Sequence, residues 1–401
     1  MISIIECVSD ELFVYDFSVH QISMAEKKFL LGNEVVGQAA RAAGARAMYG
    51  YPITPASEIM HYWARETGSE AGQKDGLVFQ QAEDEIGASF MLLGGVLAGT
   101  RAFTATAGPG HVLMQDAFSM AEAMRLPVVA YVMQRGGPST STVIYSQQEV
   151  TLACFGGNGN GFRVVYSPSS LQELFDYGIK SFNTAWKWRF PTFMLGDGYS
   201  AKMMGEVEVY SPAERGIEMV PTEPYLLGER QLTDLSKVMP SPEIEVRSSN
   251  GVEYVCLRNC LNLEEETLAV NTEIKTAWDQ MAVEATEHEL YGQDHAQTVI
   301  VAHGLVAAAA RSAIDLSGDT HGGTSLFRPI TLNPFPVQAL RRAVEQAERI
   351  VVAESAYNQL GRLVKDALYG HSSVPIVEFF RPSFSILPDD LNDLLVGHQV
   401  S

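Results

Sequence analysis

Residues 80–110 decide how this chain folds. Residues 80–88 read QQAEDEIGA, residues 86–98 carry no charge and are mostly small or apolar, and residues 104–110 read TATAGPG. A helix of this composition is expected to be buried against its neighbours. Acidic residues at its start gain from the helix dipole, but a carboxylate that enters a core requires a partner or a catalytic role. Glu83, Asp84 and Glu85 are therefore the first candidates for a functional site.

Strand-like and helix-like segments alternate around this stretch. The predicted strands, each followed by a loop and a helix, are residues 46–51, 76–80, 102–106 and 127–133. Their continuously apolar character predicts an α/β fold, in which helices cover both faces of a parallel sheet. Such sheets bind ligands at the carboxyl ends of their strands. We expect the site there, because the notable loops all follow strands: residues 51–55, 83–85, 106–110 and 135–140.

The chain of 401 residues divides into four predicted segments. Residues 1–23 form an N-terminal extension without the basic region of a signal peptide. Residues 24–205 form the first α/β domain. Residues 206–297 are a connection with a helix at 271–290 and a small hairpin near residue 252, and residues 298–401 form a second α/β domain.

The composition excludes several classes of protein. A formal net charge of -20 repels the phosphate backbone, so nucleic acid is not expected as a partner. No apolar run reaches the roughly 18 residues that a membrane span requires. The four cysteines are scattered and form no metal or cluster motif. Such cysteine usage is typical of a reducing cytoplasm, where we expect the protein to be.

Two further motifs each allow a structural and a functional interpretation. The loop Tyr51–Pro55 is either a rigid turn, in which Thr54 or Ser57 caps the next helix, or a preformed site that offers backbone amides and the Thr54 hydroxyl to an anion. Arg135 follows an apolar strand and precedes two glycines. It either forms a structural salt bridge or binds a carboxylate through its planar guanidinium.

Residues 196–198 read GDG, which is similar to the start of the magnesium motif of thiamine diphosphate enzymes. That motif requires a later asparagine, and none occurs between Gly198 and Asn250. We interpret Asp197 as part of a turn after a strand, and we predict no metal site on this chain.

Taken together, the motifs resemble the alpha subunit of the 2-oxoacid:ferredoxin oxidoreductases, a family of pyruvate, 2-oxoglutarate and branched-chain 2-oxoacid enzymes. Four segments carry the resemblance: residues 50–55 (GYPITP), 81–86 (QAEDEI), 104–110 (TATAGPG) and 134–140 (QRGGPST). Residues 327–336 (FRPITLNPFP) resemble the second domain of this family. Residues 156–161 and 167–170 are most similar to the branched-chain and 2-oxoglutarate members.

The resemblance implies a fold and a reaction. The first domain would be the pyrimidine-binding domain of a thiamine diphosphate enzyme, and the second would be a transketolase C-terminal-like domain. The reaction would be the oxidative decarboxylation of a 2-oxoacid. The most expected substrates are 2-oxoglutarate and the branched-chain 2-oxoacids. Coenzyme A would take the acyl group, and two electrons would pass singly through iron–sulfur clusters to ferredoxin.

The resemblance also implies roles for individual residues. Glu85 would bond N1′ of the aminopyrimidine of the cofactor and so promote loss of the thiazolium C2 proton. Arg135 would hold the carboxylate of the 2-oxoacid, and Thr54 would hydrogen-bond the substrate. The residues expected to contact the cofactor are Pro52, Ile53, Glu85 and Gly108.

A hetero-oligomer with two copies of this chain is the third implication. The chain has no magnesium–diphosphate motif and no cluster-binding cysteine set, so a beta subunit would hold Mg²⁺, the diphosphate and an iron–sulfur cluster. Gamma and small ferredoxin-like subunits are expected as further partners. Two alternatives remain open: a non-catalytic partner or scaffold subunit of the same fold, and an indolepyruvate or oxalate enzyme of the same superfamily.

Overall fold

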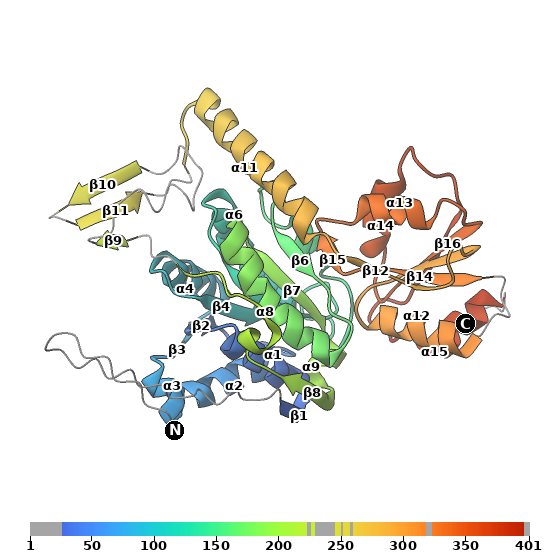
Figure 1. The fold of residues 1–401 in the computed structure, drawn as a ribbon, viewed down its shortest axis with the longest axis horizontal. Helices are drawn as coiled ribbons and strands as arrows, with labels where there is room; N and C mark the ends of the chain where they lie inside the picture. Colours follow the sequence, from blue (N-terminus) through green and yellow to red (C-terminus); the bar gives the residue numbers. More distant parts are fainter. Residues whose placement is uncertain are drawn as a thin grey trace, which may run out of the picture.

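The computed structural model describes residues 26–222, 226–228, 245–249, 252–256, 260–317 and 323–396. Two α/β units make up most of the molecule, and a long helix, α11 (Glu264–Ala285), lies against the first of them (Figure 1). The predicted extension at residues 1–23 lies outside the described residues. Within the described segments, no helix is long and apolar enough to cross a membrane.

The first unit is built on a seven-stranded sheet with the strand order β15-β6-β7-β5-β4-β2-β3. All its strands except β15 are parallel to their neighbours, as the alternating sequence pattern predicts. In chain order the strands are β2 (Ala47–Gly50), β3 (Val78–Gln81), β4 (Ala102–Thr106), β5 (Val129–Gln134), β6 (Val164–Tyr166), β7 (Thr192–Asp197) and β15 (Thr331–Asn333). The helices are α1 (Gly32–Ala42), α2 (Ser57–Gly68), α3 (Glu70–Lys74), α4 (Glu85–Leu97), α5 (Gly108–Leu113), α6 (Gln115–Ala123), α7 (Val150–Phe155), α8 (Leu171–Trp188) and α9 (Gly198–Lys202).

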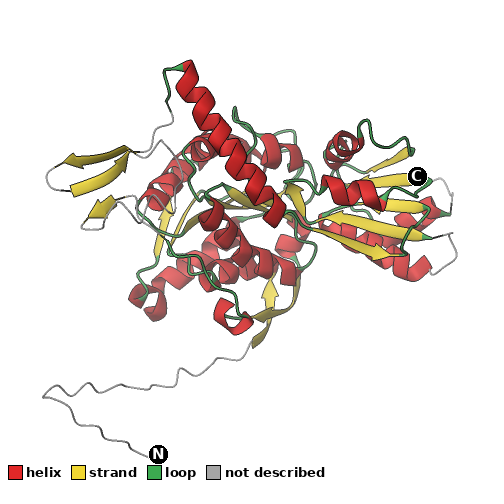
Figure 2. Cartoon of the chain, turned by 45° about the horizontal axis from the view of Figure 1, so that its top comes forward, coloured by secondary structure: helices red, strands yellow, loops and turns green. Residues whose placement is uncertain are grey.

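Helices cover both faces of this sheet, as expected for continuously apolar strands (Figure 2). Helices α2 and α8 lie on one face, and α4 lies on the other. The ring of Tyr49 packs against α4 at Gly95, where a Cβ would lie 2.6 Å from the ring. Small residues in α4 therefore allow the close approach that the sequence predicts. The aromatic core on the α2 and α8 face is formed by Trp63, Phe103, Tyr131 and Phe182.

Helix α4 begins at Glu85. Asp84 is the N-cap residue, and its Oδ1 accepts a hydrogen bond from the amide of Gly87 at 2.7 Å. The cap satisfies one of the free amides at the start of the helix. As a consequence, Glu85 occupies the first helical position and enters the core.

Two antiparallel strands close the first unit and are absent from the sequence prediction. Strand β1 (Glu26–Leu31) pairs with β8 (Met204–Val209), and the short helix η1 (Pro212–Arg215) follows. Strand β8 crosses the predicted boundary between residues 205 and 206. The next segment contains β9 (Leu226–Gly228) and the hairpin of β10 (Glu245–Ser249) and β11 (Val252–Cys256), so the predicted hairpin is present.

The second unit has a five-stranded sheet with the order β12-β14-β13-β16-β17, and only β12 is antiparallel. The predicted helix at 271–290 is wrong at both ends, because α11 begins at Glu264 and residues 288–292 form β12. The strands are β12 (His288–Gly292), β13 (Thr298–Val301), β14 (Thr324–Pro329), β16 (Arg349–Glu354) and β17 (Ile376–Phe380). The helices are α12 (Gly304–Ser317), α13 (Val337–Ala343), α14 (Leu360–Leu368) and α15 (Pro388–Leu395).

Buried polar contacts hold the two units together. The carboxylate of Asp197, at the end of β7, accepts a hydrogen bond from the amide of Leu305 at 2.7 Å. The side chain of Gln147 donates to the carbonyl of His303 at 2.9 Å and accepts from the amide of Ser355 at 3.0 Å. Strand β15 adds a main-chain connection, because it follows β14 of the second sheet and pairs with β6 of the first.

Candidate active site

The loops predicted to form the site converge at the carboxyl edge of the first sheet. Strands β2, β3, β4 and β5 are parallel neighbours, so the segments that follow them emerge at the same edge. The loop after β2 is joined to the one after β3, since the amide of Ala82 donates to the carbonyl of Gly50 at 3.0 Å. The site residues predicted from the sequence lie in these segments.

Glu85 is a nearly buried carboxylate, with 7% of its surface exposed. A Cβ on Gly110 would lie 2.7 Å from its Oε1 and 2.6 Å from Oγ1 of Thr106, so glycine at 110 leaves the space that the Glu85 side chain occupies. The hydroxyl of Thr106 is itself buried without a hydrogen-bond partner. Across the described segments, the Glu85 carboxylate receives no hydrogen bond from a side chain or an amide. Glu83 and Asp84, in contrast, are exposed.

The loop after β2 places Thr54 at the surface of the site. Helix α2 has Ala56 as its N-cap and no side-chain cap, so the capping interpretation of Thr54 and Ser57 is wrong. The Thr54 hydroxyl is therefore not engaged in capping. The loop is instead shaped by a turn in which the amide of Ala56 donates to the carbonyl of Ile53 at 2.9 Å, and Pro52 is exposed.

Arg135 is buried, with 4% of its surface exposed, and its Nη1 donates to the carbonyl of Thr54 at 2.7 Å. Its Nε is buried without a partner. No ion pair of Arg135 occurs among the residues that the structure describes, which disfavours the structural salt bridge. Burial lowers the pKa of Arg135, and the nearby charges of Glu149 and Glu85 oppose that shift.

Gly108 brings the loop after β4 against Arg135. Its φ is +50°, a conformation that residues with side chains rarely adopt, and a Cβ would lie 2.5 Å from Nε of Arg135. The close approach thus depends on glycine at this position.

Glu149 is a buried acid of the site that the sequence analysis missed. Its Oε1 accepts hydrogen bonds from the amides of Gly108 at 2.8 Å and Arg135 at 2.9 Å, and its Oε2 lies 2.8 Å from Nδ1 of the buried His111. The surrounding sequence, SQQEV, gives no signal of this role.

Asp197 is also more than a turn residue. It is buried, its Oδ1 accepts from the side chain of Gln134 at 3.0 Å, and its Oδ2 accepts from the amide of Leu305. Burial raises the pKa of Asp197 to about 7, and the two donors oppose that shift. Among the described residues no three acids, histidines or cysteines are grouped so as to hold a metal ion.

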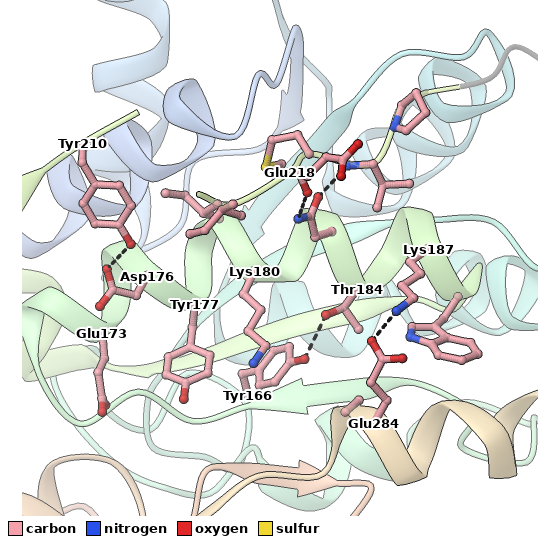
Figure 3. A pocket seen from close by; sticks show the side chains of 18 residues that line it. Tyr166, Glu173, Asp176, Tyr177, Lys180, Thr184, Lys187, Tyr210, Glu218 and Glu284 are labelled. Atoms are coloured by element: carbon pink, nitrogen blue, oxygen red, sulfur yellow. Dashed lines mark hydrogen bonds and ion pairs between the residues drawn. The ribbon is translucent and has the colours of Figure 1, made fainter. Parts of the chain in front are cut away.

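A cavity of about 940 Å³ lies elsewhere, along α8 (Figure 3). Two contacts join side chains that line it: Lys187 pairs with Glu284, and the hydroxyl of Tyr210 donates to Asp176 at 2.7 Å. None of the predicted site residues lines this cavity.

Two known protein families match this chain. Residues 38–249 match the thiamine diphosphate-binding domain of pyruvate flavodoxin/ferredoxin oxidoreductases, and residues 296–382 match core domain II of pyruvate:ferredoxin oxidoreductase. The chain belongs to the 2-oxoacid:ferredoxin oxidoreductase family. The α/β architecture inferred from the sequence is thus confirmed as a thiamine diphosphate-binding fold.

Relatives within the family carry different substrate names. The chain is 30% identical to ketoisovalerate oxidoreductase subunit VorB of Methanothermobacter marburgensis over 338 residues, which cover 84% of this chain and 88% of the relative. It is 29% identical to 2-oxoglutarate synthase subunit KorA of Archaeoglobus fulgidus over 385 residues, which cover 93% of this chain and 99% of the relative.

A solved member of the family has the same fold. The 2-oxoglutarate:ferredoxin oxidoreductase of Magnetococcus marinus, solved with 2-oxoglutarate, coenzyme A and succinyl-CoA bound, superposes with a TM-score of 0.79 at 22% identity. The match covers 93% of this chain and 65% of the solved chain, so this chain spans somewhat less than two thirds of that relative's length.

Proposed function

We propose that this chain is the alpha subunit of a coenzyme A-dependent 2-oxoacid:ferredoxin oxidoreductase and supplies the aminopyrimidine side of a shared active site. One observation carries the proposal: Glu85 is a nearly buried carboxylate without a partner in the described chain, at the carboxyl edge of a parallel sheet. A buried carboxylate of this kind requires a hydrogen-bond partner. A cofactor ring nitrogen is such a partner.

The residues around Glu85 fit thiamine diphosphate. Gly110 and Gly108 allow the loop after β4 to lie close to Glu85 and Arg135, and Thr106 offers an unpaired hydroxyl. Glu85 would share a proton with N1′ of the aminopyrimidine, and Pro52, Ile53 and Gly108 would line the cofactor. When bound, thiamine diphosphate supplies the carbon nucleophile and the electron sink that decarboxylation of a 2-oxoacid requires.

Arg135 and Thr54 are assigned to the substrate. The Arg135 guanidinium donates from Nη1 to the carbonyl of Thr54 and has no carboxylate at ion-pair distance among the described residues. A guanidinium with free donors binds a carboxylate through a charge-assisted pair. Thr54 is exposed beside it and can donate its hydroxyl to the same 2-oxoacid.

The rest of the site would come from a beta subunit. An apolar patch flanks Glu85 on α4 and α5, and its exposed members are Ile86, Phe90, Met91, Val112 and Leu113. Large exposed apolar patches mark interfaces with other proteins. We assign the patch to the beta subunit, which would hold Mg²⁺, the diphosphate and an iron–sulfur cluster.

The complete complex would also contain gamma and small ferredoxin-like subunits and two copies of this chain, in the cytoplasm. The complex would cleave the bond between the carboxylate and the 2-oxo carbon and release CO2. Coenzyme A would take the acyl group, and two ferredoxins would take one electron each. The names of the relatives support 2-oxoglutarate and branched-chain 2-oxoacids as the substrates to test first.

The test is the variant Glu85→Gln in the reassembled complex, assayed with 2-oxoglutarate and with 2-oxoisovalerate under reduction of ferredoxin. We expect turnover to fall by about 100-fold or more, the usual cost of losing an acid–base group. The matched control is Glu83→Gln, which removes an exposed acid two positions earlier and should leave turnover unchanged. Unchanged turnover in the Glu85 variant would favour the scaffold alternative, and turnover of indolepyruvate or oxalate alone would favour the other superfamily enzymes.

A further inference from the structure

Glu149 joins two parts of the site that are far apart in the sequence. Its Oε1 accepts hydrogen bonds from the amide of Gly108, on the loop after β4, and from the amide of Arg135, at the end of β5. His111, one turn into α5, holds the second oxygen through Nδ1. Glu149 is 5% exposed and His111 is fully buried, so water does not compete for these contacts.

The contacts of Glu149 determine where the Arg135 guanidinium can lie. Gly108 and Arg135 are drawn to a single oxygen atom, which places the glycine directly against Nε of Arg135. From this position the guanidinium extends to the Thr54 carbonyl, which its Nη1 reaches at 2.7 Å. Without the shared acceptor, two amides would be buried unsatisfied, and the loop and the strand end would have to separate to find other acceptors.

We propose that Glu149 is a positioning residue for substrate recognition: it fixes the Arg135 guanidinium so that it can bind the carboxylate of a 2-oxoacid. The proposal rests on the proposed function, because it assigns a substrate to Arg135. Glu149 touches neither substrate nor cofactor and acts through Arg135. His111 contributes by fixing the orientation of the Glu149 carboxylate.

The variants Glu149→Ala and Glu149→Gln separate positioning from general stability. Alanine removes the shared acceptor, whereas glutamine retains one oxygen that can accept both amides. In the assembled complex, with whichever of 2-oxoglutarate and 2-oxoisovalerate the parent turns over, we expect Glu149→Ala to raise KM about tenfold or more, with a smaller change in kcat. Glu149→Gln should recover most of that loss.

The matched control is Glu122→Ala. Glu122 is 3% exposed, accepts a hydrogen bond from the amide of Asn160 at 2.6 Å and lies 3.7 Å from the Arg163 guanidinium. It is thus another buried acid that fixes a glycine-containing loop, and these contacts are with neither Arg135 nor Gly108. Its removal should lower the unfolding midpoint as much as Glu149→Ala does and leave KM unchanged.

A double-mutant cycle with Arg135→Lys decides whether Glu149 acts through Arg135. If it does, Glu149→Ala should add less than about twofold to the KM of the Arg135→Lys complex. Independent, multiplicative effects would overturn the proposal, as would a Glu149→Ala complex whose only defect is a lowered unfolding midpoint. A binding measurement provides a readout besides activity: calorimetric titration of the cofactor-free complex with thiamine diphosphate should give similar affinities for the parent and Glu149→Ala, and a large loss of affinity would contradict a role confined to Arg135.

Failure of the proposed function gives a different result. In that case Arg135→Lys alone would leave KM for the 2-oxoacid unchanged, and Glu85→Gln would retain turnover. An effect of Arg135→Lys without an effect of Glu149→Ala would overturn only the positioning role.

Discussion

The carboxyl edge of the first sheet has two halves of different character, and they meet at the end of β5. Gln134, the last residue of β5, donates to Asp197, which also accepts from Leu305 of the second unit. This covered half is buried between the two units. Arg135, the next residue, turns to the carbonyl of Thr54 and belongs to the open half.

The difference lies in where each half finds its partners. In the covered half, acceptors such as Asp197 and Gln147 meet donors of the same chain. In the open half, the Glu85 carboxylate has no hydrogen-bond partner in the described chain, and the apolar side chains next to it are exposed. One sheet edge therefore provides both an internal joint and, in our proposal, a site that other molecules complete.

The largest expected effect concerns the open half. Phe90→Asp places a charge in the apolar patch, which we assign to the beta subunit. We expect the complex to weaken by at least about 2 kcal/mol, as for a central interface residue, and activity at assay concentrations to be lost. Size-exclusion chromatography of the mixed subunits measures the loss of the complex. The control is Val283→Asp, which replaces an apolar side chain that is 87% exposed on α11. Normal assembly of the Phe90 variant would show that the patch has another role.

The covered half should make stability depend on pH through Asp197. Its pKa is raised to about 7 from 3.8, so the folded protein binds the proton more tightly than the unfolded chain does. Stability from this group is full below pH 3.8 and is lost as the pH rises through 7. Asp197→Asn cannot titrate, so it should be more stable than the parent at pH 8, by up to about 4 kcal/mol, and similar to it at pH 4. Gln134 can rotate to accept from the new amide, because its Oε1 is buried without a partner.

His303, in the same interface, should change stability with pH in the opposite direction. Burial, with a smaller contribution from Arg328, lowers its pKa to about 3 from 6.5. Its stabilisation is present above pH 6.5 and is lost as the pH falls. Between pH 4 and 6.5 the two groups should largely cancel in the parent, whereas Asp197→Asn should become more stable as the pH rises. Unfolding midpoints across this range measure the effect, with the exposed Asp294→Asn as control. Equal pH profiles for the parent and Asp197→Asn would contradict the assignment.

Gly108→Ala should affect both stability and activity. The variant would hold alanine at φ +50°, a backbone conformation that residues with a side chain rarely adopt. Its methyl group would lie 2.5 Å from Nε of Arg135. We expect a loss of about 1–3 kcal/mol in stability and a raised KM, because Arg135 must move. Gly68→Ala, at a helical position where nothing lies within 4 Å, is the matched control for denaturant unfolding and kinetics. A Gly108→Ala complex with parental KM would show that the position of Arg135 tolerates displacement.

The smallest effect is expected outside both halves. Lys187 pairs with Glu284 across the cavity beside α8, and their side chains are 48% and 55% exposed. Solvent-exposed ion pairs contribute little, so Lys187→Ala should change the free energy of unfolding by less than about 1 kcal/mol and leave activity unchanged. A clear loss of activity in this variant would mean that the cavity along α8 has a function of its own.

Sequence patterns predict the repeating part of the molecule and the strand ends well, because both follow from local periodicity and from the geometry of parallel sheets. The positions of Thr54, Gly108 and Arg135 at one edge follow in the same way. Glu149 and Asp197 could not be predicted, since their role arises from contacts between segments distant in the chain. Strand β15 was missed for a similar reason: three residues carry too little periodicity, and the contacts that fix it are long-range, such as those from Nδ2 of Asn333 to the carbonyls of Gly161 and Arg163.

Strand β15 also determines where the chain can be divided. A fragment that ended before Thr331 would lack this strand and leave the amides and carbonyls of β6 as a bare edge. Bare edges recruit strands from other molecules and lead to aggregation. A second fragment carrying β14 and β15 could restore solubility by strand addition. Strand β15 thus protects the first unit from self-association.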